Sequence, residues 1–366
     1  MKRIFAMCLA MIMVLTMLAS CGKKGDLTPE ETTDAIDGDA SDVITPGGEI
    51  IPGATDAPTP DAPAPEAAAP ERDGQEYVLF GSYPQTLESN DDVCTALEEK
   101  AGALPTASNA GSWKSYRYLS AGQKSDYMWY IDLEHEGAKY RGVYFTEYRS
   151  YDVSAAGSED VSFQDDNGFT KGTAYWFKYE PIKWRILSED GGKALVVSEV
   201  ILDAQSFNDA SMSGNYKSSE IREWLNATFY TTAISEAQQK FVETTTVDNS
   251  AATTNDPSNM YACENTDDEV FLLSYADVMN SAYKFSSDSD RSIMGTDYAV
   301  CQGLFVKAEN GNASMWWLRS ADAVQSERVS RVKPDGTVGV NKTNVNTVGV
   351  LAAMTISLDG GENPDA

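Results

Sequence analysis

The segment from residue 23 to residue 76 contains almost no aromatic or large apolar side chains, and it divides the chain in two. The run APTPDAPAPEAAAP at residues 57–70 is typical of its proline, alanine and acid content. Such a composition cannot bury enough apolar surface to offset the entropy lost on folding. Between Gly25 and Glu76 there are 14 acidic residues and a single basic one, Arg72, so charge repulsion favours an extended spacer. The sequence therefore predicts a disordered tether over residues 21–76 and confines the fold to residues 77–358, before a disordered tail at 359–366.

The N-terminus has the pattern of a secretory signal. Lys2 and Arg3 precede an apolar run over residues 4–18, which is short of the roughly 20 residues that a membrane-spanning helix needs. The run ends in LASC at residues 18–21, which resembles the lipobox of bacterial lipoproteins. That resemblance implies removal of a signal peptide at residues 1–20 and a diacylglyceryl group on the Cys21 sulfur. Because two acyl chains give stable anchoring, we expect a lipid-anchored protein on the outer face of the cytoplasmic membrane.

The net charge and the motifs of the sequence reduce the number of possible functions. The formal net charge is −28 and no basic patch is visible, which argues against nucleic acid and anionic lipid surfaces as partners. None of the GxSxG, GxGxxG, Walker A, HExxH or EF-hand patterns occurs, so the enzyme classes that depend on them lack support. The sequence predicts no cofactor and no metal site. The acidic stretch at residues 265–269 leaves calcium open as an alternative, although acid-rich loops are more often merely solvated.

Cysteine and histidine are scarce. Cys94, Cys263 and Cys301 remain besides the lipidated Cys21, and this odd number without CxxC spacing indicates neither a disulfide framework nor a zinc site. A single bridge between Cys263 and Cys301 stays open. His135, the only histidine, lies in the polar segment LEHEG, so we interpret it as a surface residue rather than a member of a catalytic triad.

Strand patterns dominate residues 77–180. Residues 77–80 predict a short strand that ends at Gly81, where Gly-Ser-Tyr-Pro follows. Further strands are expected at residues 116–119, 127–133 and 139–145, the last two with clear two-residue alternation.

A hairpin follows this β-rich part. Residues 182–187 alternate apolar and basic side chains, and residues 194–200 are almost wholly apolar. The turn EDGG between them is a strong hairpin signal. The second strand is apolar on both faces, so we expect it at the centre of a sheet.

Helix signals then form one block. The first helix has one face that is shared by Ile221, Trp224, Leu225 and Thr228. Residues 235–238 have the pattern of a capping box before a second helix, which includes residues 241–242. Ser274 follows a strand expected at 270–273 and caps a third helix. From residue 315 on, the patterns are those of strands at 327–332, 337–340 and 348–358. The order predicts an α+β fold: an antiparallel or mixed sheet with a block of two to three short helices, in a single domain with a core at 181–358.

Six stretches resemble a family of unknown function that is common in surface proteins of Gram-positive bacteria, domain-of-unknown-function family 6273. They are LFGSYPQT (79–86), PIKWRIL (181–187), ALVVSEVILD (194–203), SSEIREWLN (218–226), EVFLLS (269–274) and WWLRS (316–320). The resemblance covers most of residues 76–358. This chain departs from the family's closing GVRPAL-like strand, because Leu351 stands where that strand has arginine. The arrangement also looks like the C-type-lectin-like fold of formylglycine-generating and related domains, which implies a closing strand beside the first but carries no activity across.

The stretch SMWWLRS lies on a predicted strand, so Trp316 and Trp317 must face opposite sides of the sheet. Trp316 shares a face with Leu318 and is expected in the core. Trp317 shares the other face with Arg319, where an arginine–aromatic pair is plausible, and this is the one candidate ligand face that the sequence offers.

Three functions remain open. A non-catalytic binding or interaction module for glycan, cell wall or protein fits the long tether and the aromatic-rich domain best. The alternatives are a structural component of the cell envelope without a ligand and, with less support, an enzyme of lectin-like fold that acts through carboxylates or an unpaired thiol.

Overall fold

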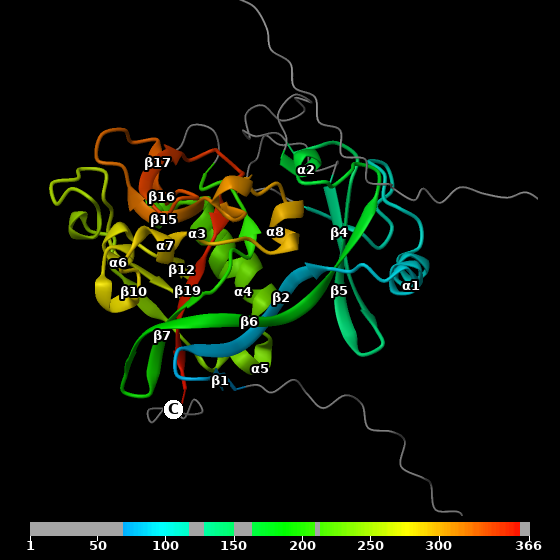
Figure 1. Ribbon diagram of the computed structural model, residues 1–366, viewed down its shortest axis with the longest axis horizontal. Coiled ribbons are helices and arrows are strands. Elements are labelled where there is room, and N and C mark those ends of the chain that lie inside the picture. The colour runs from blue at the N-terminus through cyan, green and yellow to red at the C-terminus, as the bar shows by residue number, and fades with distance from the viewer. Residues whose placement is uncertain (1–68, 117–127, 150–162, 209–212, 359–366) are drawn as a thin grey trace, which may run out of the picture. The chain divides into compact units, whose positions relative to one another are not determined.

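The computed structural model describes residues 69–116, 128–149, 163–208 and 213–358 (Figure 1). The predicted signal peptide, Cys21, the tether up to residue 68 and the tail at 359–366 lie outside these ranges. The same holds for all but the first residue of the strand expected at 116–119. The prediction of disorder up to residue 76 was wrong at its end, because residues 71–73 form a strand that pairs with residues 77–79. The described residues belong to one compact unit.

The larger sheet contains ten strands within the described ranges, in the order β12-β19-β7-β6-β5-β4-β3, with β1, β2 and β9 paired off this path. Its strands are β1 (Glu71–Asp73), β2 (Tyr77–Leu87), β3 (Lys114–Ser115), β4 (Met128–His135), β5 (Ala138–Phe145), β6 (Ala174–Asp190), β7 (Lys193–Ser198), β9 (Val242–Glu243), β12 (Phe271–Leu272) and β19 (Ala352–Ser357). Strands β4 and β5 confirm the predictions at 127–133 and 139–145 and pair antiparallel along their whole length.

The predicted hairpin is formed by β6 and β7. Gly191 and Gly192 connect the strands with φ angles of 56° and 78°, as the tight turns that match strand twist require. Strand β7 lies between β6 and β19, so its central position is also confirmed. Strand β6 is longer than predicted, at 17 residues, because its first half pairs with β5 and its second half with β7.

The first predicted strand was expected to end at Gly81, but β2 continues to Leu87. Its register against β6 shifts between Leu79 and Ser82, so the chain passes Gly81 in a bulge. Gly81 has a φ of 68°, and a Cβ there would lie 2.5 Å from the Ala233 carbonyl oxygen. Glycine at this position therefore allows helix α4 to approach the strand rather than ending it.

A second sheet has five strands in the order β17-β16-β15-β18-β8. They are β8 (Asp203–Ala204), β15 (Trp316–Ala321), β16 (Arg328–Val332), β17 (Val338–Lys342) and β18 (Gly349–Val350). Strands β15 and β18 are parallel and the other pairs are antiparallel. Two small ladders complete the strands, β10 (Thr245–Val247) with β11 (Thr266–Asp268) and β13 (Val306–Lys307) with β14 (Ala313–Ser314).

The segment predicted as one closing strand at 348–358 is divided at Leu351. The residues before it form β18 in the smaller sheet, and those after it form β19 in the larger sheet. Leu351 itself is 1% exposed, so the residue that replaces the family arginine is part of the core. Strand β19 pairs with β7, β9 and β12 rather than with β2, which differs from the closing strand that the lectin-like resemblance implied.

The predicted helix block is present. It comprises α3 (Glu220–Trp224), a π-helical turn (Leu225–Phe229), α4 (Tyr230–Ala233), α5 (Glu236–Gln239) and α6 (Tyr275–Val278). Capping boxes open α5 at Ser235 and α6 at Ser274, as predicted. Helix α5 is shorter than expected, because Val242 already belongs to β9.

Helices also occur outside this block, so the prediction that they sit together was wrong. They are α1 (Asp91–Ala101), α2 (Phe163–Asp166), α7 (Asp288–Arg291) and α8 (Asp297–Cys301). Helix α1 was missed because it buries only Leu97 and Ala101 and has too narrow an apolar stripe to read. The α+β class with mostly antiparallel sheets is confirmed.

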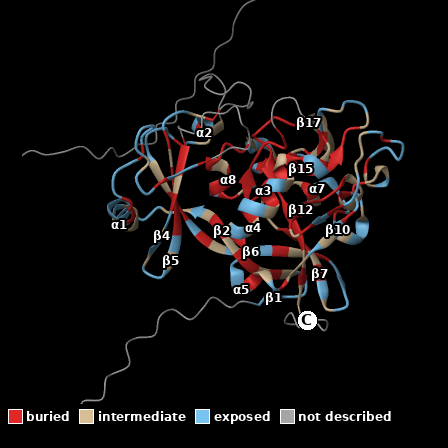
Figure 2. Ribbon diagram, turned by 180° about the vertical axis from the view of Figure 1, so that it is seen from behind, coloured by how far each residue is buried: buried red, intermediate tan, exposed pale blue. Residues whose placement is uncertain are grey.

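Buried apolar side chains form two clusters. The main cluster extends between the sheets and the helix block, and a satellite cluster holds Leu97, Ala101, Trp113, Trp129, Ile131, Tyr140 and Trp176. Figure 2 shows the contrast: α1, which contributes Leu97 and Ala101 to the satellite cluster, is otherwise largely exposed, whereas β12 and β15 are largely buried. None of the helices in the described ranges has the length and apolar content that a membrane crossing needs.

Candidate functional site

The two tryptophans of WWLRS lie on opposite faces of β15, and both are 0% exposed. The Trp316 indole N–H donates to the Arg291 carbonyl oxygen over 3.0 Å, which confirms Trp316 as a core residue. The Trp317 indole N–H donates to the Gln205 carbonyl oxygen over 2.8 Å, and its ring meets Phe207 edge-on at a centroid distance of 5.7 Å. Trp317 therefore presents no surface to a ligand.

Arg319 is also internal, at 7% exposure. Its Nη1 donates to the Asp277 carboxylate and to the Leu272 carbonyl oxygen, each over 2.7 Å. The guanidinium finds its partner on helix α6, not on Trp317 or at the surface. The structure thus closes the Trp317–Arg319 face that the sequence offered for a ligand, because both sides of β15 are covered.

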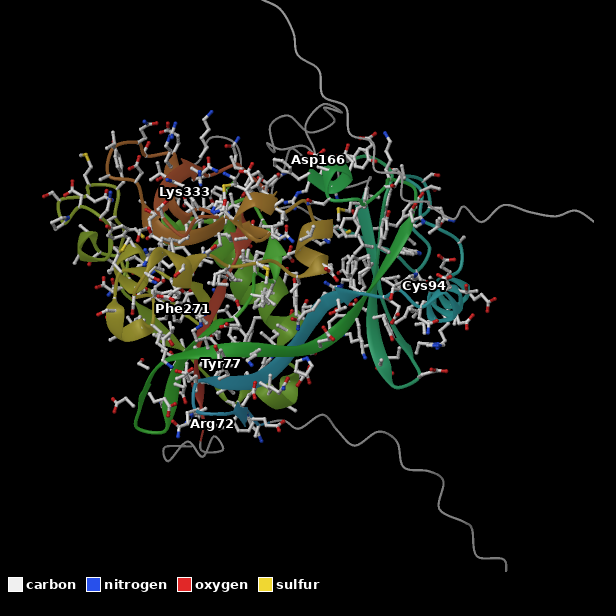
Figure 3. The ribbon with its side chains drawn as sticks, in the orientation of Figure 1. Arg72, Tyr77, Cys94, Asp166, Phe271 and Lys333 are labelled. Atoms are coloured by element: carbon white, nitrogen blue, oxygen red, sulfur yellow. The ribbon has the colours of Figure 1, made fainter. Side chains whose placement is uncertain are left out.

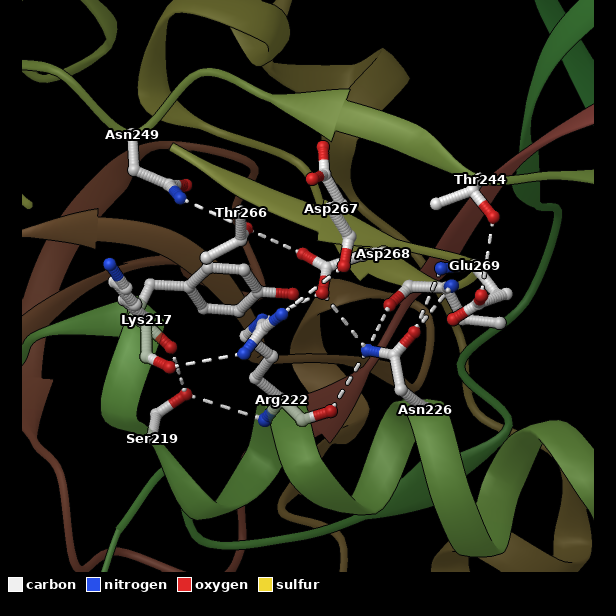
Figure 4. A network of polar contacts seen from close by, with 12 residues as sticks. Lys217, Ser219, Arg222, Asn226, Thr244, Asn249, Thr266, Asp267, Asp268 and Glu269 are labelled. Carbon is white, nitrogen blue, oxygen red and sulfur yellow. Dashed lines mark hydrogen bonds and ion pairs between the residues drawn. The ribbon is translucent and has the colours of Figure 1, made fainter. Parts of the chain in front are cut away.

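A second polar network joins SSEIREWLN to EVFLLS (Figure 4). Arg222 Nε donates to Asp268 Oδ1 over 2.6 Å, and the Asp268 side chain is 0% exposed. The Asn226 amide donates to the Val270 carbonyl oxygen over 3.0 Å and accepts from the backbone N–H groups of Glu269 and Val270. These contacts fix α3 and the π-helical turn after it against β11 and the two residues that follow β11, so the conspicuous polar residues of these stretches hold the fold.

The acidic stretch at 265–269 is therefore not a free loop. Residues Thr266–Asp268 form β11, and burial raises the pKa of Asp268 while Thr266 and Arg222 act in the opposite direction. Among the described residues, no group of three His, Cys, Asp or Glu side chains is arranged to hold a metal ion. Cys94, Cys263 and Cys301 are free, so the bridge between Cys263 and Cys301 does not form. The His135 side chain is 16% exposed at the end of β4 and lies 4.0 Å from the Glu136 carboxylate.

Asp203 is the most perturbed carboxyl group of the core. It is 0% exposed, and its Oδ2 accepts from the Tyr83 hydroxyl over 2.7 Å. Burial raises the pKa of Asp203 to about 6, against the hydrogen bonds from Tyr83 and the Ala204 backbone N–H. The pair joins β2 of the larger sheet to β8 of the smaller one, which is a structural link between two landmark stretches.

A cleft of about 800 Å³, here called the polar cleft, opens in the described part of the chain. Its lining comes from the start of β2, from β6, from the two residues that follow β7 and from the segment at 281–294; Figure 3 labels Tyr77. The lining residues are Glu76, Tyr77, Arg185, Glu199, Val200, Ser281, Lys284, Ser286, Ser289, Asp290, Ser292, Ile293 and Met294.

Both signs of charge line the polar cleft. Arg185 Nε lies 2.8 Å from Glu199 Oε2 in a partly buried pair. Lys284 Nζ lies 3.0 Å from Glu76 Oε1, and these two side chains are 42% and 61% exposed. Hydrogen bonds from the Ser287 side chain and backbone lower the pKa of Asp290. The cleft can therefore offer donors, acceptors and charges to a polar ligand.

Sequence reasoning missed this cleft. The alternation in PIKWRIL does place Arg185 on the face opposite the buried Trp184, and that signal could have marked it as accessible. Glu76 and Lys284 are 208 residues apart in the chain, and no local pattern predicts that they meet.

The molecule is thus an α+β domain with two principal sheets, mostly antiparallel, and short helices. Residues 191–358 match the model of a family described as "Domain of unknown function (DUF6273)", which supports the resemblance for this part of the chain. The match begins after the stretches at 79–86 and 181–187, so it does not extend to the whole of residues 76–358. No curated protein and no solved structure matches the chain.

Proposed function

We propose that this protein is an extracytoplasmic binding module, held at the membrane by a lipid on Cys21, whose polar cleft engages a glycan, cell-wall polymer or protein. The observation that carries the proposal is the polar cleft itself, an open space of about 800 Å³ with charged side chains at its surface. Ligand sites commonly have volumes of about 300–1,000 Å³ and a few convergent polar groups.

The charged side chains of the polar cleft can give up an ion-pair partner within the protein for a charged or polar group of a ligand. An exposed ion pair such as Lys284–Glu76 contributes only about 0–1 kcal/mol to stability, so a ligand can replace either partner at small cost. The partly buried pair of Arg185 and Glu199 is better fixed and would orient the ligand. Ser281, Ser286 and Ser289 add hydroxyl groups that both donate and accept.

The C-type-lectin-like fold is part of this proposal. The order of the helix block, the tryptophan-bearing strand β15 and the closing strand β19 supports it. The pairing of β19 with β7 departs from the arrangement that the resemblance implies, and no activity is attached to it.

The anchor is tested by Cys21→Ser in the producing cell. We expect the unmodified chain to fractionate with membranes and to carry a diacylglyceryl mass at its N-terminal cysteine, and the variant to lose both. A variant that stays with the membrane, or a wild-type chain without the added mass, would refute the anchor but leave the polar cleft untested by this route.

The polar cleft is tested with the full chain carrying Cys21→Ser on an array of neutral and acidic glycans and in pull-downs with purified cell walls. Lys284→Glu reverses a charge in the cleft, and Lys193→Glu reverses the charge of another exposed pair, with Glu243, outside it. We expect binding that Lys284→Glu weakens and Lys193→Glu leaves unchanged. No binding in either assay, or equal loss in both variants, would contradict the proposal.

A further inference from the structure

One guanidinium of the polar cleft keeps open hydrogen-bond donors. Arg185 Nε donates to Glu199 over 2.8 Å, whereas Nη1 and Nη2 have no acceptor among the described residues. The Arg185 side chain is 15% exposed and lines the cleft, and neither terminal nitrogen is among the buried, unpartnered polar atoms of the described residues. A ligand in the cleft can therefore reach these donors.

The surroundings of Arg185 decide which of its edges faces a ligand. Its Cζ lies 5.7 Å from the centre of the Phe285 ring, and Phe285 is 2% exposed, so the guanidinium rests against a fixed wall. Because Nε is occupied by Glu199, the edge formed by Nη1 and Nη2 remains. The two N–H groups of that edge are parallel, which is the geometry that a carboxylate accepts with both of its oxygens.

The cleft also holds a carboxylate without a cation. Asp290 Oδ2 accepts from the backbone N–H and the hydroxyl of Ser287 over 2.8 and 2.9 Å, and no described residue forms an ion pair with Asp290. The Ser287 hydrogen bonds lower the pKa of Asp290, and the charge of Arg185 acts in the same direction. The two opposite charges therefore lie near each other in the cleft with a gap between them.

This pattern of charges selects the ligand. A purely anionic ligand is repelled by the three carboxylates of the lining, Glu76, Glu199 and Asp290. A purely cationic ligand leaves the open edge of Arg185 without an acceptor. An uncharged ligand removes water from Arg185 and Asp290 and returns no counter-charge to either. A ligand with one group of each sign satisfies both side chains.

We infer that the polar cleft binds a short zwitterionic peptide, with its terminal carboxylate on the open edge of Arg185 and its terminal ammonium group on Asp290. Ser286 and Ser289 are exposed in the lining and can hydrogen-bond to the amide groups of such a peptide. The inference rests on the proposed function, because it names the class of ligand for the same site.

The experiment titrates the full chain carrying Cys21→Ser with alanine, dialanine and trialanine, whose two charges are increasingly far apart, and measures binding by calorimetry. The ligand that binds most tightly is then compared with its N-acetylated and its C-amidated forms. We expect each blocked form to bind about tenfold more weakly or worse, because each loses one charged group and its hydrogen bonds. The doubly blocked form should not bind.

Two variants assign the two ends of the peptide. In Arg185→Gln the free and the amidated peptide should bind about equally, and in Asp290→Asn the free and the acetylated peptide should do so. Asp248→Asn is the matched control and should bind as its parent chain does. The Asp248 carboxylate also accepts from a serine backbone N–H, over 2.9 Å, but it does not line the cleft.

The inference is overturned if none of the three ligands binds, if acetylation or amidation leaves binding unchanged, or if Asp290→Asn still prefers the free amino end. Should Arg185→Gln fail to fold, the blocked peptides on the parent chain decide the matter. Glycerophosphoethanolamine is a zwitterion without amide groups, and binding as tight as that of the peptide would assign the cleft to a lipid head group instead.

Failure of this inference differs from failure of the proposed function. Binding of glycans or cell walls that Lys284→Glu weakens, in a chain that binds no free peptide, overturns the inference and leaves the proposed function in place. Absence of all binding, to glycans, cell walls and peptides alike, contradicts both.

Discussion

Buried tryptophans occur in both apolar clusters, but they are used differently. In the family-matched part, Trp316 and Trp317 donate to carbonyl oxygens of distant segments. In the satellite cluster, Trp113 and Trp176 are nearly as buried and have no acceptor among the described residues. The conspicuous tryptophan motif therefore marks two indoles whose hydrogen bonds are complete, whereas the less conspicuous Trp113 and Trp176 keep buried donors without an acceptor among the described residues.

Arg319→Ala is the test of this comparison with the largest expected effect on stability. It removes a buried guanidinium and leaves the Asp277 carboxylate and the Leu272 carbonyl oxygen without this donor, so we expect the free energy of unfolding to fall by about 3–5 kcal/mol. Urea denaturation measures the change. Arg72→Ala is the control, because the exposed pair of Arg72 and Glu189 should contribute no more than about 1 kcal/mol. A similar small loss in Arg319→Ala would mean that β15 does not depend on its internal partners.

Trp317→Phe tests the indole directly. The substitution leaves a cavity and deprives the Gln205 carbonyl oxygen of a donor, so we expect a loss of about 2–4 kcal/mol in the free energy of unfolding. The same urea denaturation assay applies. A loss below about 1 kcal/mol would remove the distinction between satisfied and unsatisfied indoles.

Asp203→Asn tests how a buried, hydrogen-bonded carboxyl group makes the stability of the fold depend on pH. The pKa of Asp203 in the folded chain, about 6, lies above the usual value of about 3.9 in the unfolded chain. Its contribution to stability is therefore complete below about pH 4 and is lost as the pH rises through 6, by roughly 2–3 kcal/mol. The asparagine side chain keeps an acceptor oxygen for the Tyr83 hydroxyl and carries no charge at any pH, so the variant should fold.

The measurement is urea denaturation of the unmodified chain and Asp203→Asn from pH 4 to pH 8. The difference between their free energies of unfolding should shift against the unmodified chain as the pH rises and become constant above about pH 7. Parallel profiles would show that Asp203 does not titrate in this range.

The smallest expected effect is that of Trp113→Phe on stability. Because the indole N–H has no acceptor among the described residues, its removal relieves an unpaired donor while the smaller ring loses some packing. We expect a change of about 1 kcal/mol or less in the free energy of unfolding. A loss as large as that of Trp317→Phe would show that the Trp113 donor is in fact satisfied, and the comparison between the clusters would fail.

Local patterns predicted the elements that depend on neighbouring residues. The two glycines of EDGG form the β6–β7 turn, and helices begin after Ser235, where a capping box was predicted, and after Ser274, which was predicted as an N-cap. Helix α1 was not predicted because its apolar stripe is too short. The break at Leu351 was not predicted because the residues before and after it are equally apolar.

The candidate sites depend on residues far apart in the chain. Arg319 and Asp277 are separated by 42 residues, and nothing near Arg319 indicates that its charge is neutralised internally. Which indole donors find an acceptor is likewise decided by the tertiary fold alone. Strand alternation predicted the burial of Trp316 correctly but that of Trp317 wrongly, and residue type could not distinguish an indole with an acceptor from one without.

The division of the closing segment at Leu351 also bears on how the chain reaches its folded state. Gly349 pairs with Ala204 in one sheet, and Ala353 pairs with Val197 in the other, so each sheet includes a pairing between residues about 150 positions apart in the chain. Contacts this distant in sequence form slowly, because a long loop must close before they are made. We therefore expect a chain truncated before residue 349 to remain open to proteases, because one short segment completes both sheets.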